Sequence, residues 1–430
     1  MALAASACLC ADATIIEQPP AEPGLPLSPE MMPQSTFKTR LLQVGPERAI
    51  KLPSQAAAMA RTGDVIEIDA EAYVADITVW TADNLTIRGV GGRAKLLAAG
   101  QSAENKATWV IKGRNTVIEN IEFAEAVSTN GNGAGIRAEG VNLTVRNCYF
   151  HDNQEGILSA LNTTTSRIII EDSEFARDGG NGGYSHEIYI SNIAQLIVRG
   201  SYFHHGRVGH LIKSRAQQNE IIANRITDED GGSASYEIDL PNGGLNIVIN
   251  NLIEQSGLTQ NSTMLENALE GPKNPIQQLW IVNNTFVNDL GRGDFIRVRA
   301  PTSVHVINNI FVGGGNVLVG GGALKNNLLA AGPGGSPHIE QPLFRTGDIT
   351  ETGTRFAADP GFLDMRDYDY RLTAKSPAIG GGIDPGMVNN FFLAPAAEYV
   401  HPMRWRPIAG GGPIDIGAYQ FATRLAGPAE

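Results

Sequence analysis

Short segments in which apolar and polar residues alternate recur along most of the chain, and their spacing predicts the fold. The segment Asn142-Leu-Thr-Val-Arg-Asn is representative, because alternate side chains are apolar, as expected of a strand with one buried face. Segments of this pattern begin at residues 84, 115, 142, 167, 195, 219, 246, 278 and 303. Their starts are 24 to 32 residues apart. Units of this length cannot bury an apolar face alone, so consecutive units must stack.

The pattern inside each unit selects one kind of stacked fold. A leucine-rich repeat is excluded because its leucine signature and helical half are absent, and a β-propeller needs blades of ~40 residues. Six asparagines are expected at one corner, where they can stack their amides and adopt a left-handed bend. These are Asn120, Asn147, Asn224, Asn251, Asn283 and Asn308. The sequence therefore predicts an all-β fold, a single right-handed parallel β-helix.

Three regions are expected along the chain. Residues 1–37 contain what looks like the end of a secretory signal, with Cys8 and Cys10, and then a proline-rich leader. Residues 38–354 form the β-helix, whose open end is capped by a short helix within 54–63. Residues 355–430 form a C-terminal cap packed on the last coils, because so short a segment with few apolar runs would be marginal alone.

Composition narrows the functional classes. The net charge of −12 disfavours a nucleic-acid-binding surface, so an anionic ligand would need a local cationic groove. No apolar run approaches the ~20 residues that span a membrane. We expect a monomer that is secreted or periplasmic. The third cysteine, Cys148, is expected to be a buried structural thiol beside Tyr149 and Phe150.

The repeats and the tail together resemble a known superfamily. The tail segments are Ala358-Asp-Pro-Gly-Phe-Leu-Asp, Tyr370-Arg-Leu-Thr-Ala-Lys-Ser-Pro-Ala-Ile and Asp415-Ile-Gly-Ala-Tyr. Over residues 38–420 the chain resembles the right-handed parallel β-helix superfamily of pectate-lyase type, including exported bacterial polysaccharide-active proteins. The resemblance implies a carbohydrate-active β-helix. It does not select one reaction, because the superfamily includes lyases, epimerases, hydrolases and phage depolymerases.

The second strand of each repeat carries the candidate chemistry. If the central isoleucine of each such strand points inward, its neighbours point outward and form columns across the stacked strands. One column holds Arg137, Leu158, Tyr189, Lys213, Asp239 and Arg297, the next holds Glu139, Ser191, Arg215 and Arg299, and the preceding one holds Glu187, Leu211 and Glu237. Adjacent strands lie ~4.8 Å apart, so Lys213 should contact both Tyr189 and Asp239.

These residue types suit β-elimination at a uronic acid. The reaction needs a cation that neutralises the carboxylate, a base for the C5 proton and an acid for the leaving oxygen. We assign Lys213 as the base, Arg215 as the carboxylate clamp, and Tyr189 or His210 as the acid. If Asp239 is adjacent, it opposes deprotonation of Lys213.

In that case Lys213 is better interpreted as a charged electrophile, and Tyr236 or a histidine becomes the base. The residues expected to bind substrate are His186, Glu187, His205, Arg137, Tyr236, Glu237 and Arg297. The substrate class is an acidic polysaccharide or oligosaccharide.

Several alternatives stay open from the sequence. Glu237, Asp239 and Glu187 could act as paired carboxylates of a glycoside hydrolase, and the lyase residues would equally serve a uronan epimerase. A non-catalytic carbohydrate-binding or adhesive β-helix is a third class, in which Lys213 and Asp239 form only an ion pair on a solvated face. The sequence specifies no cofactor with certainty and leaves Ca²⁺ open: Asp228 and Asp230 are weak candidates for a Ca²⁺ site in what is otherwise a solvated acidic turn.

Overall fold

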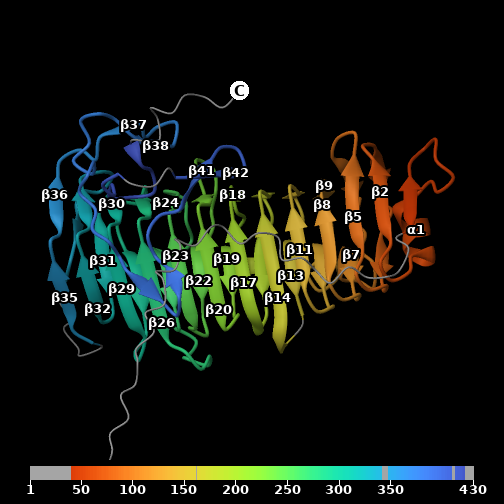
Figure 1. Cartoon of the computed structure of the whole chain (residues 1–430), viewed down its shortest axis with the longest axis horizontal. Coiled ribbons are helices and arrows are strands. Elements are labelled where there is room, and N and C mark those ends of the chain that lie inside the picture. Colours follow the sequence, from red (N-terminus) through yellow and green to blue (C-terminus); the bar gives the residue numbers. More distant parts are fainter. Residues whose placement is uncertain (1–39, 161, 341–346, 409–411, 422–430) are drawn as a thin grey trace, which may run out of the picture. The chain divides into compact units, whose positions relative to one another are not determined.

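The computed structural model describes residues 40–160, 162–340, 347–408 and 412–421. In these residues the strands stack into three parallel sheets of 13, 12 and 11 strands, here called A, B and C, which follow one another in each coil (Figure 1). The fold is a single right-handed parallel β-helix, as the repeats predict. The predicted leader, residues 1–37 with Cys8 and Cys10, lies outside the described residues, and the predicted region boundaries stay predictions.

Sheet A is built from the alternating segments that reveal the repeat in the sequence. Its strands, in spatial order, are β1 (Leu41–Val44), β2 (Val65–Asp69), β5 (Thr86–Val90), β8 (Thr116–Glu119), β11 (Leu143–Arg146), β14 (Thr163–Glu171), β17 (Ile193–Arg199), β20 (Gln218–Ile222), β23 (Leu245–Ile249), β26 (Gln278–Val282), β29 (Ser303–Ile307), β32 (Gly322–Lys325) and β35 (Ile349–Thr352). In β11 the apolar Leu143 and Val145 are buried in the core, as the alternation predicts.

Sheet B follows each sheet A strand after a short bend. Its strands are β3 (Ala72–Val74), β6 (Ala94–Leu97), β9 (Ile121–Ala124), β12 (Tyr149–His151), β15 (Glu174–Ala176), β18 (Tyr202–His204), β21 (Arg225–Thr227), β24 (Leu252–Gln255), β27 (Thr285–Asn288), β30 (Ile310–Val312), β33 (Leu328–Ala330) and β36 (Arg355–Ala357). Its inward residues include Phe123, Phe150, Phe175 and Phe203, whose rings stack with centroids 5.0, 4.8 and 4.6 Å apart. Ring spacing therefore matches strand spacing.

Sheet C completes each coil and carries the predicted site. Its strands are β4 (Thr78–Trp80), β7 (Ala107–Ile111), β10 (Ala134–Ala138), β13 (Glu155–Ser159), β16 (Ile188–Ile190), β19 (His210–Ser214), β22 (Tyr236–Leu240), β25 (Thr263–Asn267), β28 (Asp294–Val298), β31 (Gly315–Val319) and β34 (Pro337–His338). The central isoleucines Ile157, Ile188, Ile212 and Ile238 belong to the buried core, as predicted.

The corner between sheets A and B contains two asparagine columns where one was predicted. Asn120, Asn147, Asn283 and Asn308 have φ between 50° and 58°, the left-handed bend expected of them. Asn224 and Asn251 lie one residue further on, in a buried column that continues through Asn284, Asn309 and Asn327. The amide groups of Asn224, Asn251, Asn284 and Asn309 each donate to the side-chain oxygen of the asparagine in the next coil.

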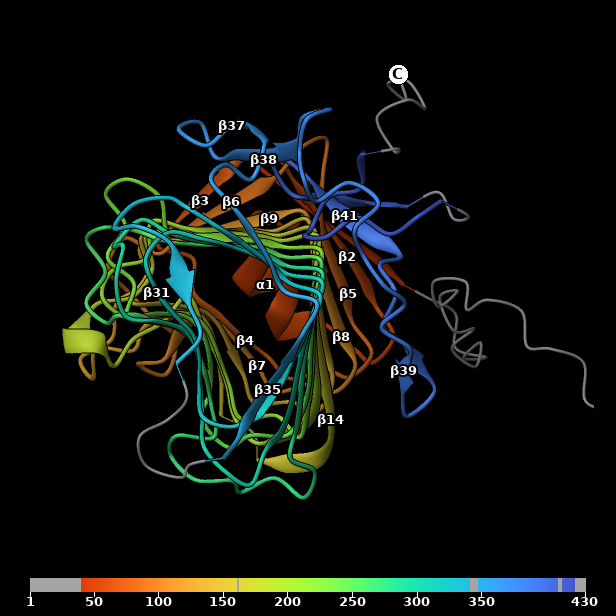
Figure 2. The same cartoon turned by 90° about the vertical axis from the view of Figure 1, so that its left-hand side faces the viewer.

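The N-terminal end of the interior is covered by α1 (Pro53–Met59), within the predicted range. Ala56 and Ala57 pack in the same hydrophobic cluster as Leu42 and Val44 of β1. Viewed along the coils, α1 lies inside the outline formed by the sheets (Figure 2). The helix therefore closes the first coil, which would otherwise expose apolar side chains.

The described part of the C-terminal region forms three short antiparallel hairpins along the side of the coils. They are β37 (Phe362–Asp364) with β38 (Asp369–Leu372), β39 (Met387–Val388) with β40 (Phe391–Phe392), and β41 (Ala397–Val400) with β42 (Arg404–Pro407). Tyr370 and Tyr399 pack against the outer face of sheet B, whereas Val388 and Leu393 pack against sheet A. The region thus rests on the lateral faces of many coils.

Cys148 lies at the same corner as the asparagines and is fully buried. Its Sγ lies 3.2 Å from the carbonyl oxygen of Arg146, and burial raises the pKa of the thiol to about 12. The expectation of a structural thiol is confirmed.

The buried asparagine column offers a test of the fold. Asn284 accepts hydrogen bonds from the backbone and side chain of Asn251 and donates to Val248 O and Asn309 Oδ1. Asn284→Ala leaves these groups without partners and should lower the free energy of unfolding by about 3 kcal/mol in urea titrations. The control Asn115→Gly removes a more exposed amide at a positive φ, where glycine is tolerated, and should cost about 1 kcal/mol or less. Equal losses would contradict the role of the buried column.

Candidate functional site

The predicted outward column is present on sheet C. Strand pairing aligns Leu158 with Tyr189, Tyr189 with Lys213, and Lys213 with Asp239. Tyr189 is half-buried, and Lys213 and Asp239 are 9% and 2% exposed. The register predicted from the isoleucines is therefore confirmed for these four residues, although the face is much less solvated than an ordinary outer face.

Lys213, Asp239 and His210 form a compact charged cluster. Lys213 Nζ and His210 Nδ1 each lie 2.7 Å from Asp239 Oδ2. Burial alone would raise the pKa of Asp239, but hydrogen bonds with Glu266 and His210 and the charge of Lys213 lower it below its ordinary value. Asp239 is therefore a carboxylate at neutral pH, and Lys213 faces a permanent negative charge.

The His210 ring is buried and held in one orientation. Burial lowers its pKa below the ordinary 6.5, although the hydrogen bond to Asp239 acts in the opposite direction. The neutral ring with its proton on Nδ1, toward Asp239, keeps Nε2 free to accept a proton. The backbone N–H of His210 donates to His186 Nδ1 at 3.0 Å, and the two rings lie 4.4 Å apart.

Arg215 lies at the next outward position on the same chain segment. Its guanidinium makes hydrogen bonds of 2.8 and 2.9 Å to both carboxylate oxygens of Glu270. Arg215 Nε also donates to the Tyr189 hydroxyl at 2.8 Å, and Nη1 donates to Asn242 at 2.9 Å. Burial would lower the pKa of Arg215, but its hydrogen bonds with Glu270 and Tyr189 raise it. Glu270 is exposed, so it covers a cation that an anionic ligand could otherwise reach.

Glu266 lies in the same outward column of sheet C, although the sequence pattern did not predict it there. It pairs with Asp239 on one side and with Arg297 on the other. Burial, followed by the hydrogen bond to Asp239, raises the pKa of Glu266 to about 10, so it is a neutral acid beside a carboxylate. The segment Thr263–Asn267 has Leu265 at the position where its two neighbouring strands have Ile238 and Ile296, which hid it from an alignment based on isoleucine.

Arg137 and Arg297 lie in the predicted column but at a distance from the cluster. Leu158 separates Arg137 from Tyr189, and Glu266 separates Arg297 from Asp239. Arg297 is bonded to Asp294 of its own strand. Both arginines therefore lie at least one strand away from the cluster, and their role in substrate binding stays a prediction.

Two predicted substrate contacts are wrong. Glu187 and Glu237 are 1% and 0% exposed, and the residues at the same strand position, such as Leu211 and Phe295, belong to the hydrophobic core. At the start of each sheet C strand the chain bends, so two consecutive side chains face the interior. Neither glutamate can therefore contact a polysaccharide, and the hydrolase set of Glu237, Asp239 and Glu187 is not assembled.

His205, a predicted substrate contact, does not lie on sheet C with the charged cluster. It follows β18 of sheet B, and its Nδ1 lies 2.7 Å from Nδ1 of His204. The histidines between residues 186 and 210 are therefore divided between two sides of the coil, since His210 begins β19 of sheet C and His186 lies just before β16 of the same sheet. Tyr236 does lie in the cluster, with its ring 4.8 Å from that of His210.

The calcium candidates have other partners. The buried Asp228 carboxylate accepts hydrogen bonds from the backbone N–H groups of Gly206 and Ala234. Asp230 is exposed, and its N–H donates to Tyr368. Within the four described ranges, no group of three or more His, Cys, Asp or Glu side chains is arranged to hold a metal ion. The two aspartates do not form a site together.

Comparisons with known proteins bear on the fold. No protein-family model matches the sequence, and a comparison with curated proteins gave no match. The structure is similar to the pectate lyase Pel9A, with a TM-score of 0.60 at 15% identity over 90% of this chain and 97% of that chain. A rhamnogalacturonan lyase is similar with a TM-score of 0.48 at 13% identity, over 76% of this chain and 91% of that chain. A PL6 family polysaccharide lyase, Pedsa3628 from Pseudopedobacter saltans, is similar with a TM-score of 0.46 at 12% identity, over 79% of this chain and 97% of that chain. The similarity to Pel9A establishes a shared β-helix and not a shared reaction.

No helix of the described residues is long and apolar enough to cross a membrane.

The buried glutamates predict an unusual pH dependence of stability. Burial raises the pKa of Glu237 well above the ordinary 4.5, so it is protonated in the folded protein while the unfolded chain ionises. The folded state therefore loses stability as the pH rises above about 4.5. Glu237→Gln should match the parent protein near pH 4 and exceed its free energy of unfolding by up to about 1.4 kcal/mol for each pH unit above that value.

Denaturant titrations near pH 4 and pH 7 would measure this difference. The exposed control Glu47→Gln should show no such trend. A difference between Glu237→Gln and the parent that does not change with pH would contradict a protonated Glu237.

Proposed function

We propose that this protein is a polysaccharide lyase that cleaves a uronic-acid-containing polysaccharide on the outer face of sheet C. The observation that carries the proposal is the cluster of Lys213, Asp239 and His210 beside Arg215 and Tyr189. It combines two cations, a neutral imidazole and a phenol, which are the groups that β-elimination requires. A pectate lyase with the same fold at a TM-score of 0.60 supports this choice of reaction class.

The cations suit the carboxylate of the substrate. The ammonium group of Lys213, 2.7 Å from Asp239 Oδ2, acts as an electrophile that stabilises negative charge developing on the uronate. Arg215 has the planar geometry for a bidentate contact with a carboxylate. A uronate that replaces Glu270 would restore the same pair of hydrogen bonds, which makes Glu270 a substitute for substrate in the free protein.

The proton transfers are assigned by the ionisation of the remaining groups. His210 is the base, because its neutral ring is oriented by Asp239. Burial raises the pKa of Tyr236, so its phenol keeps its proton and is a poor base. Tyr189 is the acid, since its hydroxyl accepts a hydrogen bond from Arg215 and can donate its own proton to the leaving oxygen.

The hydrolase alternative finds less support. The carboxyl groups of Asp239 and Glu266 are the only adjacent pair in the column among the described strands of sheet C, and they are hydrogen bonded to each other. Glycosidase carboxyl pairs are ~5–9.5 Å apart, because a sugar carbon or a water lies between them. An epimerase would use the same residues as the lyase, and only the product distinguishes the two reactions.

A panel of acidic polysaccharides tests the reaction class. Incubation should produce unsaturated uronate, read by its ultraviolet absorbance, together with new reducing ends. Lys213→Ala should lower the rate by about 100-fold or more, because it removes a cation that stabilises the transition state. Lys325→Ala, an exposed lysine on sheet A, should retain the parent rate, and thermal melting should confirm that both variants fold.

Reducing ends without unsaturation would replace the lyase by a hydrolase, and inverted uronates with no cleavage would replace it by an epimerase. Binding without any chemical change would favour the adhesive β-helix.

The pH profile tests the base. Because the pKa of His210 lies below 6.5, kcat/KM should rise with pH to a plateau whose acidic limb is centred below pH 6.5. His210→Gln should remove this limb together with most of the activity. An acidic limb centred above about pH 8 would instead assign the proton transfer to a group other than His210.

A further inference from the structure

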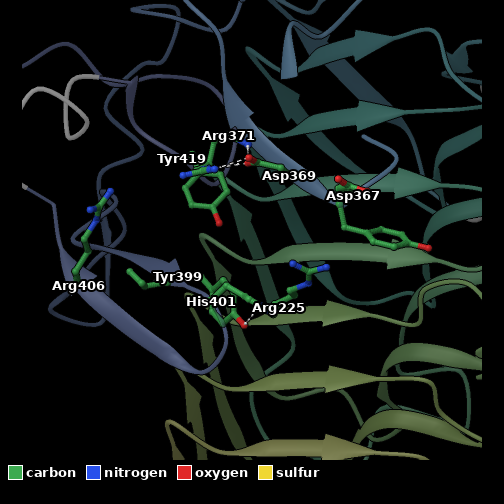
Figure 3. A pocket seen from close by; sticks show the side chains of 10 residues that line it. Arg225, Asp367, Asp369, Arg371, Tyr399, His401, Arg406 and Tyr419 are labelled. Carbon is green, nitrogen blue, oxygen red and sulfur yellow. Dashed lines mark hydrogen bonds and ion pairs between the residues drawn. The ribbon is translucent and has the colours of Figure 1, made fainter. Parts of the chain in front are cut away.

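A cavity on a different sheet from the candidate lyase cluster is formed jointly by the coils and the C-terminal hairpins. It has a volume of about 340 Å³ and lies over the outer face of sheet B (Figure 3). Arg225 of β21 forms one wall, Asp367 and Arg371 of the first hairpin form another, and Tyr399 and the residues after it form a third. We propose that this cavity binds a neutral sugar residue through its hydroxyl groups.

The arginines that line the cavity are already neutralised by carboxylates. Each of its three arginines is paired with a carboxylate. The pairs are Arg225–Glu229, Arg371–Asp369 and Arg406–Glu398, at N–O distances of 2.7, 2.5 and 2.5 Å. Asp367 adds a further negative charge to the lining. An anionic ligand would therefore gain little attraction, whereas the guanidinium N–H groups, held in place by their partners, can donate to neutral hydroxyls.

The other lining residues match the mixed character of a sugar. Tyr419 projects into the cavity with its hydroxyl toward the interior, and His401 closes the opposite side (Figure 3). Burial lowers the pKa of His401, so its ring is neutral. Tyrosine and histidine rings offer apolar faces for the C–H groups of a pyranose and polar atoms for its hydroxyls. Asp367 supplies an acceptor for a pair of them.

The size of the cavity also selects its ligand. A volume of about 340 Å³ is near the lower end of the range for small-molecule sites, which suits one or two sugar units and excludes a folded peptide. The cavity is separate from the candidate lyase cluster: Arg225 belongs to sheet B, whereas Asp239 belongs to sheet C of the same coil. The proposal therefore does not depend on the lyase reaction.

Calorimetric titration of the whole protein with neutral sugars tests the proposal. The probes are glucose, galactose, mannose, xylose and rhamnose, and at least one should bind. Tyr419→Phe and Asp367→Asn should each weaken that sugar about fivefold, as expected for the loss of one hydrogen bond. Tyr370→Phe is the matched control, because this buried hydroxyl has no hydrogen-bond partner among the described residues and does not line the cavity. It should leave the affinity unchanged.

The comparison of galactose with galacturonate separates this site from the sheet C face. Binding of galacturonate that persists unchanged in Tyr419→Phe belongs to the other face and supports the charge argument. The proposal is overturned if no neutral sugar binds, if Tyr419→Phe leaves neutral-sugar binding intact, or if the Tyr419-dependent site prefers galacturonate. Loss of lyase activity in Lys213→Ala with neutral-sugar binding retained would confirm that the two sites are independent.

Discussion

The spacing of ~4.8 Å between parallel strands is the constraint on which the whole molecule depends. It brings side chains at the same strand position of successive coils into contact. Each column must therefore consist of side chains that can pack favourably against one another. Phenylalanines meet this condition by stacking, and Asn251 and Asn284 meet it by donating from one amide to the next. Like charges do not, and where charged residues occupy a column they alternate in sign or lose their charge.

The column through Lys213, Asp239 and Glu266 shows both outcomes, because opposite charges alternate along it and one carboxyl group loses its charge. Lys213 and Asp239 form an ion pair, and Glu266 is neutral because a second carboxylate beside Asp239 would be repelled. Burying such a pair stabilises a fold little, since desolvation offsets most of the attraction. Its retention on a largely buried face is more readily explained by chemistry than by stability, which is why the proposed function rests on this cluster.

The fold was predictable because alternation and period are local properties of the sequence. The register of Tyr189, Lys213 and Asp239 was predictable for the same reason, since one aligned isoleucine determines a whole strand. Glu187 and Glu237 were misplaced because strict alternation fails where a strand begins at a bend. Glu270 was not predicted because it lies in a turn, where no repeat pattern applies. The sheet B cavity was not predicted because its walls come from segments that are distant in the sequence.

The lateral packing of the C-terminal hairpins has a consequence for how the solenoid comes apart. In a repeat protein each coil is stabilised mainly by its neighbours, so unfolding can proceed one coil at a time from an end. Here Tyr202 of β18 and Leu328 of β33 share one hydrophobic cluster with the hairpins, and Asn250 and Asn283 donate to Ala418 O and Asp415 O. These coils are joined crosswise into one cooperative unit. The hydrophobic cluster that includes the hairpins has no buried member before Tyr202, and an earlier coil is reached by a polar contact from Arg93 Nη2 to Met403 Sδ at 3.7 Å. Fraying should therefore begin at the α1 end.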